Sequence, residues 1–396
     1  MKERTRAGIG MVLMGAALLG SGPVAAQSLI GSRGLGLPIE AANARARALG
    51  GEGLGLLGGN LNPADLASST GLLIPTMNFT LQPYWGTGVV EGESLTAQGT
   101  RFPLLGLAYP IIDLNGMVTL TFSSFMDQRW QAEEDGTVIL SGVPTPVTNT
   151  FKSEGGIAAL RLGWAQRLGR SLSLAVSAGV HTGSTTRTYT RTFDSLEVST
   201  GEIIPFKDGG KWQYQGPTAS LGASWDPVDV LRLAGSVTWS GKLDAKPTSL
   251  TKGQGATYEI PTVFRVGATG VLTPKLFLNL GMSYENWTAS EGGLEPETVA
   301  GGIWSFGGGL ELEASGLGGR TLPIRLGIRH SDLPFLFKAE KPTERVFSGG
   351  LGLNLTQADQ FVLAGVDLAV ERGSREAGTF KEDFWRGTIT FRVSGW

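Results

Sequence analysis

The segment "VLTPKLFLNLGMSYENW", from Val271 to Trp287, alternates between two kinds of side chain. Successive side chains of a strand point to opposite faces, so an extended chain here has one face that is apolar along its whole length. Strands of soluble sheets are shorter, with about 5 to 6 residues. The apolar face carries Leu276, Leu278, Leu280, Met282 and Tyr284, and the other face carries Phe277, Asn279, Gly281, Ser283 and Glu285.

The same alternation recurs from about residue 72 to the end of the chain, without a convincing helix between the repeats. Period-2 patterns bounded by turn residues predict strands. The sequence therefore predicts 14 strands, at 72–84, 99–111, 115–127, 151–168, 171–187, 212–226, 229–242, 257–272, 275–287, 300–314, 321–331, 344–356, 360–372 and 383–396.

The connections between these strands alternate between short and long. Short turns are expected at 112–116, 168–170, 226–228, 273–274, 314–320 and 356–359, and long polar loops at 85–98, 128–150, 188–211, 243–256, 288–299, 332–343 and 373–382. An antiparallel meander with all its short turns at one end is typical of bacterial outer-membrane barrels. We therefore predict an all-β fold, a 14-strand antiparallel transmembrane β-barrel over residues 72–396, with both ends of the barrel chain at the periplasmic end.

The apolar faces agree with this prediction. Trp225 lies beside a short turn, whereas Trp239 and Tyr284 lie near long loops, as the two aromatic girdles of such a barrel require. The apolar face is expected to contact outer-membrane lipid, and the polar face to line a lumen.

The N-terminus predicts export. Residues 1–26 carry early basic residues, a short apolar run and small residues before a cleavage point, which are the marks of a signal peptide. No later apolar run reaches the roughly 20 residues of a membrane-spanning helix. A formal net charge of −2 argues against nucleic-acid binding, which uses a basic surface. We expect the protein in the outer membrane of a bacterial cell.

Residues 27–71 do not follow the strand pattern. The segment is rich in glycine and alanine, with one short helical possibility at 39–49. Small residues pack closely against a wall, and glycine permits tight bends. We predict that this segment is a plug that fills the barrel.

The order "ARARALGGEG" followed by "NPADLAS" resembles the N-terminal hatch of the FadL/TodX family of outer-membrane transporters for hydrophobic compounds. Asn62, Pro63 and Ala64 match the Asn-Pro-Ala motif of that family. The segments "IPTVFRVGATGVLTPKLFLNLGMSYENW", "PIRLGIRHSDLPF" and "FSGGLGLNL" are similar to its later strands. The resemblance implies a plugged 14-strand barrel that passes long-chain fatty acids or other apolar molecules by passive diffusion.

Charged residues occupy the lumen-facing phase of several predicted strands. One interpretation is a network of ion pairs that stiffens the barrel and holds the plug. The other is that one or two arginines bind the carboxylate headgroup of a substrate such as a fatty acid. Both interpretations also apply to Arg45 and Arg47 of the plug. The predicted lumen residues are Arg161, Arg232, Arg265, Arg325, Arg329, Glu311 and Asp367.

Enzymatic chemistry has little support in the sequence. His181 and His330 are the only histidines, cysteine is absent, and neither histidine lies in a nucleophile motif. We expect no catalytic residues, no metal and no cofactor, and we expect both histidines to be solvated. No nucleotide-binding loop is present, so passage would follow a concentration gradient.

Two other functions remain open at this stage. A non-transporting partner in outer-membrane assembly or secretion would use the same barrel, and a general porin is disfavoured because a plug leaves little open channel. The transported compound, the exit route and the oligomeric state are left open. Pro103, Pro217 and Pro323 are candidates for a break in the wall, or simply for bulges and strand starts.

Overall fold

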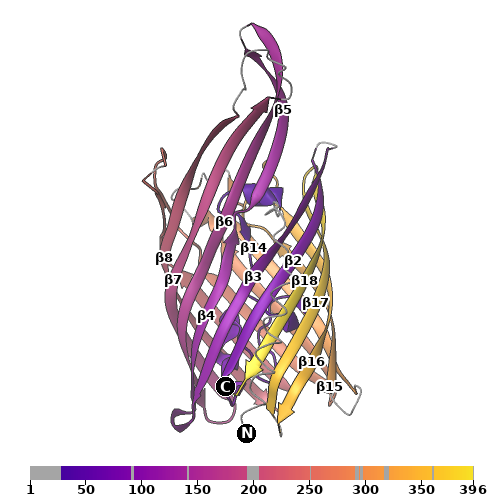
Figure 1. The fold of residues 1–396 in the computed structure, drawn as a ribbon. Coiled ribbons are helices and arrows are strands. Elements are labelled where there is room, and N and C mark those ends of the chain that lie inside the picture. The colour runs from indigo at the N-terminus through magenta and orange to yellow at the C-terminus, as the bar shows by residue number, and fades with distance from the viewer. Residues whose placement is uncertain are drawn as a thin grey trace, which may run out of the picture.

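A closed antiparallel barrel forms the body of the protein in the computed structural model (Figure 1). The structure describes residues 28–90, 93–140, 142–193, 205–249, 251–289, 294, 298–315, 321–358 and 361–395. The predicted signal peptide and the last residue, Trp396, lie outside the described residues. Among the residues described, no helix is long and apolar enough to cross a bilayer.

Fourteen strand paths of the described chain make up the wall, and each pairs with its neighbours in antiparallel register. The last path pairs with the first, from Ser394 opposite Thr76 to Lys381 opposite Val89, which closes the barrel. The strands are β2 (Thr76–Val90), β3 (Glu93–Ile111), β4 (Gly116–Asp127), β5 (Trp130–Leu140), β6 (Val143–Leu168), β7 (Leu172–Phe193), β8 (Phe206–Val228), β9 (Leu231–Ser240), β10 (Leu243–Pro247), β11 (Ala256–Tyr258), β12 (Val263–Thr273), β13 (Leu276–Asn286), β14 (Gly302–Ser315), β15 (Thr321–Asp332), β16 (Thr343–Ala358), β17 (Phe361–Ala377) and β18 (Phe380–Ser394).

Three of the fourteen paths consist of two strands in succession. β4 and β5 both pair with β6, so β5 continues β4 beyond a short interruption. β9 and β10 likewise both pair with β8. β11 pairs with β10, and β12 pairs with β9, so these two also form one path. The predicted number of strands is confirmed.

The long-loop end of the barrel differs from the prediction. Residues 85–98, 128–150 and 373–382 were expected to be loops, but most of each segment is strand. β5 to β8 rise farthest above the rest of the barrel (Figure 1). The error has a physical cause: beyond the membrane neither face of a strand must be apolar, so the period-2 contrast that predicts a strand disappears.

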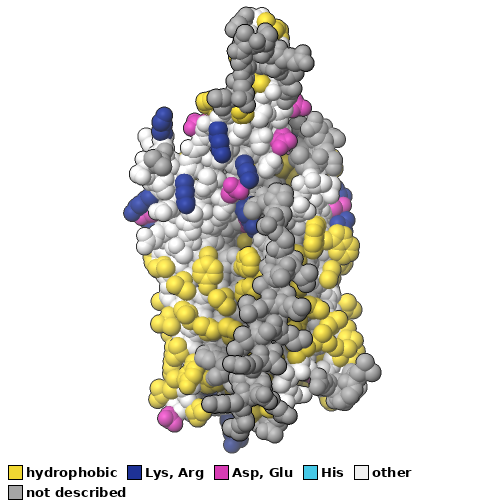
Figure 2. All heavy atoms as spheres, in the orientation of Figure 1, with side chains coloured by type: hydrophobic (Ala, Val, Ile, Leu, Met, Phe, Trp, Pro, Cys, Tyr) yellow, Lys and Arg dark blue, Asp and Glu magenta, His cyan; other side chains and the backbone are white. Residues whose placement is uncertain are grey.

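The exterior carries the apolar band that the sequence predicts. In the opening strand, now β13, Leu280 is 51% exposed, whereas its neighbour Asn279 is 4% exposed and faces the lumen. Hydrophobic side chains surround the lower half of the visible face, with charged side chains above them (Figure 2). Trp225 and Trp239 are half exposed, as residues of aromatic girdles would be.

Residues 28–71, called the luminal segment below, lie inside the barrel (Figure 1). The helix expected at 39–49 is shorter, because only five residues are helical, and it begins after Asn43, whose side chain accepts a hydrogen bond from the Ala46 backbone N–H at 2.9 Å. The segment contains η1 (Leu29–Ser32), β1 (Leu37–Pro38), α2 (Ala44–Ala48) and η2 (Pro63–Gly71).

Glycine lets the luminal segment contact the wall backbone directly. Gly50 has φ of +92°, which L side chains rarely adopt. A Cβ atom added at Gly327 of β15 would lie 2.5 Å from the Gly50 nitrogen, and one added at Gly307 of β14 would lie 2.2 Å from the Gly50 oxygen. The glycine content of both partners therefore permits close packing inside the lumen.

Candidate functional site in the lumen

The helix α2 is tied to the wall by an ion network on its Arg45 side. Arg45 donates to both carboxylate oxygens of Glu311 on β14, at 2.6 and 2.9 Å, and to the Leu57 carbonyl at 2.7 Å. Arg325 on β15 donates to Glu311 at 2.5 Å and to Asp367 on β17 at 2.6 Å. The structure thus brings four of the predicted site residues into one network.

A second network surrounds Arg47, whose side chain is almost fully buried. Arg47 forms an ion pair with Glu40 at 2.9 Å. Arg329 on β15 pairs with the same Glu40 and with Glu344 on β16. The network continues through Arg375, which contacts Glu344 at 2.7 Å. Its other members are Glu371 and Arg386, paired at 2.7 Å, and Glu382, paired with Arg375 at 3.0 Å.

Several members of this second network were missed by the sequence analysis. Arg375 and Glu382 fall within residues 373–382, for which the sequence predicts a loop. Glu371 shares the inward phase of Asp367 on β17, so strand phase alone would have found it. Glu344 and Arg386 likewise lie on the inward faces of β16 and β18.

Arg232 also holds the luminal segment. Its guanidinium donates to both oxygens of Asp226, at 2.6 and 2.8 Å, and to the Leu56 carbonyl at 3.2 Å. Paired charges therefore account for Arg45, Arg47 and Arg232 as well as for the wall residues above, as the structural interpretation expects.

Arg161 and Arg265 differ from the other predicted arginines. Within the described residues, neither has a carboxylate within 4.0 Å. Arg161 on β6 is 9% exposed and contacts only the hydroxyls of Ser123 and Thr218, at 3.3 and 3.4 Å, and its Nε has no partner there. Arg265 on β12 contacts the Thr238 hydroxyl at 3.4 Å. Arg161 thus has no acidic neighbour among the described residues, whereas Arg265 lies in the electrostatic field of Glu52 and Glu285.

Both arginines line one cavity of about 110 Å³ above α2, called the upper cavity below. Glu52 of the luminal segment faces the same space. Burial raises the pKa of Glu52 to about 7, and the negative charge of nearby Glu40 adds to the effect. Other lining residues are Pro38, Ile39, Phe125, Met126, Ile260, Val263 and Glu285.

The Asn-Pro-Ala motif builds the floor of the upper cavity. The Asn62 side chain accepts a hydrogen bond from the Ala64 N–H at 3.0 Å and donates to the Gly53 carbonyl at 3.3 Å. Pro63 occupies the first turn of η2, where its missing N–H costs nothing. All three motif residues line the cavity, so the motif both starts η2 and ties it to the preceding turn.

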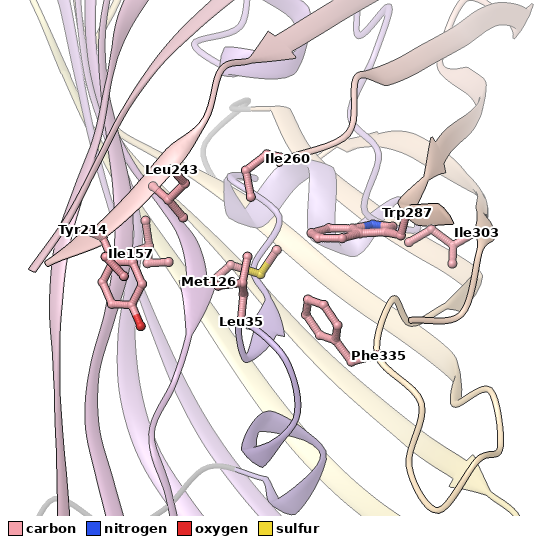
Figure 3. Packing of buried hydrophobic residues seen from close by; sticks show 10 residues of the cluster. Leu35, Met126, Ile157, Tyr214, Leu243, Ile260, Trp287, Ile303 and Phe335 are labelled. Atoms are coloured by element: carbon pink, nitrogen blue, oxygen red, sulfur yellow. The ribbon is translucent and has the colours of Figure 1, made fainter. Parts of the chain in front are cut away.

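An apolar cluster closes the lumen at the long-loop end. Figure 3 shows its side chains converging from the wall and from the luminal segment. Met126 and Ile260 belong both to this cluster and to the lining of the upper cavity, so the two are continuous. The cluster consists of Leu35, Met126, Ile157, Tyr214, Leu243, Ala245, Ile260, Trp287, Ile303 and Phe335.

The backbone ladder of the wall is interrupted beside this cavity, where side chains still join the two strands: the Ser124 hydroxyl donates to the Phe102 carbonyl at 2.9 Å, and Arg101 pairs with Asp127 at 2.9 Å. Backbone pairing of β3 with β4 ends at Leu104 opposite Ser123. Farther along β4, the luminal strand β1 takes the place of β3, with Leu37 opposite Asp127 and Pro38 opposite Met126. This pairing is possible because the chain approaches β4 at a glycine; a Cβ at Gly36 would lie 2.3 Å from the Asp127 oxygen.

The three prolines have different positions relative to this interruption. Pro103 lies in the bulge between β2 and β3, directly beside the end of the β3–β4 ladder. Pro217 and Pro323 each lie one residue before a ladder begins, at Thr218 and Ile324 respectively. Of these three, Pro103 is the one that lies beside the place where β1 replaces β3 as the partner of β4.

Comparison with known proteins identifies the fold. No protein-family model matches the chain, and no curated protein matches it in sequence. Among solved structures, the toluene transporter TbuX of Ralstonia pickettii is similar over 90% of this chain and 99% of its own, with 12% identity and a TM-score of 0.58. The fold is that of the FadL/TodX transporters. The toluene transporter TodX of Pseudomonas putida is similar over 90% of this chain and 98% of its own, with 13% identity and a TM-score of 0.57. A Pseudomonas aeruginosa FadL homologue is similar over 90% of this chain and 98% of its own, with 12% identity and a TM-score of 0.56.

Within this FadL/TodX fold the two histidines have different surroundings. His330 is exposed on the outward face of β15, in phase with Ile328. His181 is not solvated, which corrects the expectation: it is fully buried, its Nε2 lies 2.9 Å from the Ser240 hydroxyl, and its ring packs on Phe125. His181 is on the inward face of β7, and its neighbour Phe125 packs against the apolar cluster. Within the described chain, no group of three or more His, Asp or Glu side chains is arranged to hold a metal ion.

Proposed function

We propose that this protein is a passive transporter for hydrophobic compounds in the bacterial outer membrane. Solved structures with this fold are named as transporters or channels for toluene and monoaromatic hydrocarbons. The apolar cluster at the long-loop end supports the same role here, because it offers an apolar solute an environment that water does not.

The substrate class that we propose is an apolar chain with a carboxylate, such as a long-chain fatty acid. The observation that carries this proposal is Arg161, a buried guanidinium in the upper cavity that lacks an acidic partner among the described residues. A buried charge without a partner is costly, and a substrate carboxylate would relieve that cost. Arg265 would be the second ligand, and the tail would lie among the residues of the apolar cluster.

In this proposal, entry begins at the part of β5 to β8 that rises above the rest of the barrel. Trp130, Phe151, Tyr189 and Trp212 line a hollow there, with the rings of Phe151 and Tyr189 5.1 Å apart. Aromatic side chains offer large apolar contact areas to a passing solute. From this hollow the solute would pass to the apolar cluster and then to the upper cavity.

The luminal segment acts as the plug in this mechanism. The upper cavity, at about 110 Å³, is smaller than typical ligand pockets of about 300 to 1,000 Å³. In this proposal the structure is a closed form, and passage requires the segment to move. The interruption between β3 and β4 is the proposed lateral exit, with β1 as its cover.

A binding assay on detergent-purified protein tests the proposal. A long-chain fatty acid and the alcohol of equal chain length are titrated against wild type, Arg161→Gln and Arg265→Gln. The matched control is Arg392→Gln, which alters an arginine of a different lumen cavity, one that Arg45 and Arg325 also line. Loss of a charged hydrogen bond predicts that Arg161→Gln weakens binding of the acid about tenfold. Binding of the alcohol and binding by Arg392→Gln should change little.

Other results would redirect the proposal. Equal affinity for acid and alcohol in wild type would assign the site to neutral hydrophobic compounds and would contradict the role of Arg161. The absence of saturable binding of either probe would favour the non-transporting partner in assembly or secretion.

A further inference from the structure

A hollow on the outer face of the barrel lies away from the lumen and from the route proposed above. It spans β17, β18, β2 and β3, with a volume of about 670 Å³. Its floor is the backbone at Gly86 and Ala97, which lie directly opposite each other. The remaining lining residues are Trp85, Thr87, Thr96, Gln98, Arg372, Asp383 and Trp385.

Two tryptophans and one arginine dominate this hollow. Trp85 lies directly opposite Trp385, and Trp385 lies directly opposite Arg372, so the three form one row across the sheet. Both indoles are half exposed. The Arg372 guanidinium lies 5.4 Å from the centre of the Trp385 ring and 3.3 Å from the Asp383 carboxylate. The arginine is thus held in place while remaining accessible, with 43% of its side chain exposed.

The row lies at the edge of the apolar band. Two residues toward the short-turn end, β17 presents Val370, which is 54% exposed, and β18 continues outward with Ile389 and Phe391. Two residues in the opposite direction, the outward positions are Thr87 and Asp383. Tryptophan at such an edge is typical of the level of lipid headgroups.

We propose that this hollow binds the phosphorylated sugar headgroup of a glycolipid in the outer leaflet. The indole faces of Trp85 and Trp385 would pack against the apolar face of a sugar ring. Arg372 would donate to a phosphate oxygen, for which its planar fork is suited. Asp383 would accept hydrogen bonds from the sugar hydroxyls. The two indole faces favour a sugar headgroup over that of a simple anionic phospholipid, which has no ring to pack against them.

The proposal does not depend on what passes through the lumen. The charges that face inward from the same strands, Glu371, Glu382 and Arg386, are paired within the second network and lie on the other side of the sheet. A glycolipid bound across β17, β18, β2 and β3 would connect the first and last strands of the barrel from outside.

The test uses the full mature chain in detergent and counts bound lipid by native mass spectrometry. The probes are bisphosphorylated lipid A, the same lipid without phosphates, and phosphatidylglycerol. The variants are Arg372→Gln, Trp85→Ala and Trp385→Ala, and the matched control is Trp239→Ala, an indole that is equally exposed on β9. Heat-modifiable migration on gels confirms that each variant is folded.

Arg372→Gln should weaken binding of bisphosphorylated lipid A about tenfold, since a hydrogen bond to a charged group is lost, with little effect on the lipid without phosphates. Trp85→Ala and Trp385→Ala should weaken both lipids, and Trp239→Ala neither. The proposal is overturned if phosphatidylglycerol binds wild type as tightly as lipid A does, if Arg372→Gln has no effect, or if Trp239→Ala causes the same losses.

Discussion

The two sides of the lumen hold the luminal segment by different means. On the side of β14 to β18, called the charged wall, arginines and glutamates pair with Glu40, Arg45 and Arg47 of the segment. On the side of β4 and β6 to β9, called the hydroxyl wall, η2 packs against small residues. The inward side chains of the hydroxyl wall include Ala165, Ser173, Ala175, Ser177, Ser220, Ser224, Ala234 and Ser236.

This difference shows which contact can open. Separating α2 from the charged wall would leave buried charges without partners, at a cost of several kcal/mol for each. Separating η2 from the hydroxyl wall exposes the apolar contact of Leu66 and Ala67 with Met117 and the wall alanines, but it leaves no buried charge unpaired, and water replaces the modest hydrogen bonds that are lost. We therefore expect the segment to stay anchored at the charged wall and to move at the hydroxyl wall, which adjoins the gap between β3 and β4.

The strongest test of this comparison is a pair of engineered disulfides. The chain has no native cysteine, so each introduced pair can form only the intended disulfide within the chain. Thr70→Cys with Ser173→Cys joins η2 to the hydroxyl wall, where the two hydroxyls are 2.9 Å apart. Ala44→Cys with Ala369→Cys joins α2 to the charged wall, where the two alanines pack together. Solute flux into liposomes should stop with the first disulfide and persist with the second.

Reduction of the disulfide is the control for both variants, since it should restore flux in the first variant. Flux that stops with the second disulfide alone would show that the charged wall is the mobile contact.

The next largest effect is expected from Arg329→Ala on the charged wall. The change leaves Glu40 and Glu344 without one of their partners, so the free energy of unfolding should fall by about 3–5 kcal/mol. Urea unfolding in lipid vesicles, followed by tryptophan fluorescence, measures this loss. Ser220→Ala on the hydroxyl wall, which removes a 3.1 Å bond to Thr238, is the matched control and should cost about 1 kcal/mol. Equal losses would contradict the comparison.

Glu52 lies between the two walls, and we expect it to have a smaller, pH-dependent effect on the free energy of unfolding. Because burial raises its pKa from 4.5 to about 7, the folded protein binds this proton more tightly than the unfolded chain does. Its stabilising contribution is therefore present below about pH 4.5 and is lost as the pH rises to about 7, by at most about 3 kcal/mol. Unfolding free energies measured from pH 5 to 8 should fall less steeply in Glu52→Gln than in wild type, and parallel curves would refute the assignment.

The smallest effect is expected from Ser236→Ala on the hydroxyl wall. The Ser236 hydroxyl is buried, and within the described residues it has no hydrogen-bond partner. Its removal should be neutral or slightly stabilising, because an unsatisfied buried hydroxyl is costly. The same urea titration checks this, and a loss above about 1 kcal/mol would indicate a partner such as a bound water.

The fold could be predicted because the bilayer imposes a contrast on every strand that crosses it. Leu280 and Asn279 illustrate the contrast, since adjacent residues lie on opposite sides of the wall. The extension above the membrane could not be predicted in the same way. β5 is surrounded by water and lacks an apolar face, so its sequence has no period-2 contrast. The register of β1 against β4 left no sequence signal that we can identify.

The charged residues of the site show a similar limit. Strand phase predicts that Arg161 and Arg325 face the lumen, and both are buried, but it cannot say which of them meets a carboxylate. That depends on how α2 is rotated and on which strands lie opposite it, and both are properties of the closed barrel. That no described acid lies beside Arg161 could be found only from the three-dimensional arrangement.

The joining of the luminal segment to the last strands has a consequence for assembly. Ser28 donates to Glu382 at 2.7 Å, although the two residues are 354 positions apart in the chain. The luminal segment therefore finds these binding partners only when the last hairpin, β17 and β18, has formed. Contacts of such long sequence separation form slowly. The interior of this barrel should thus be completed late, and the nascent lumen should remain hydrated until the final strands close around it.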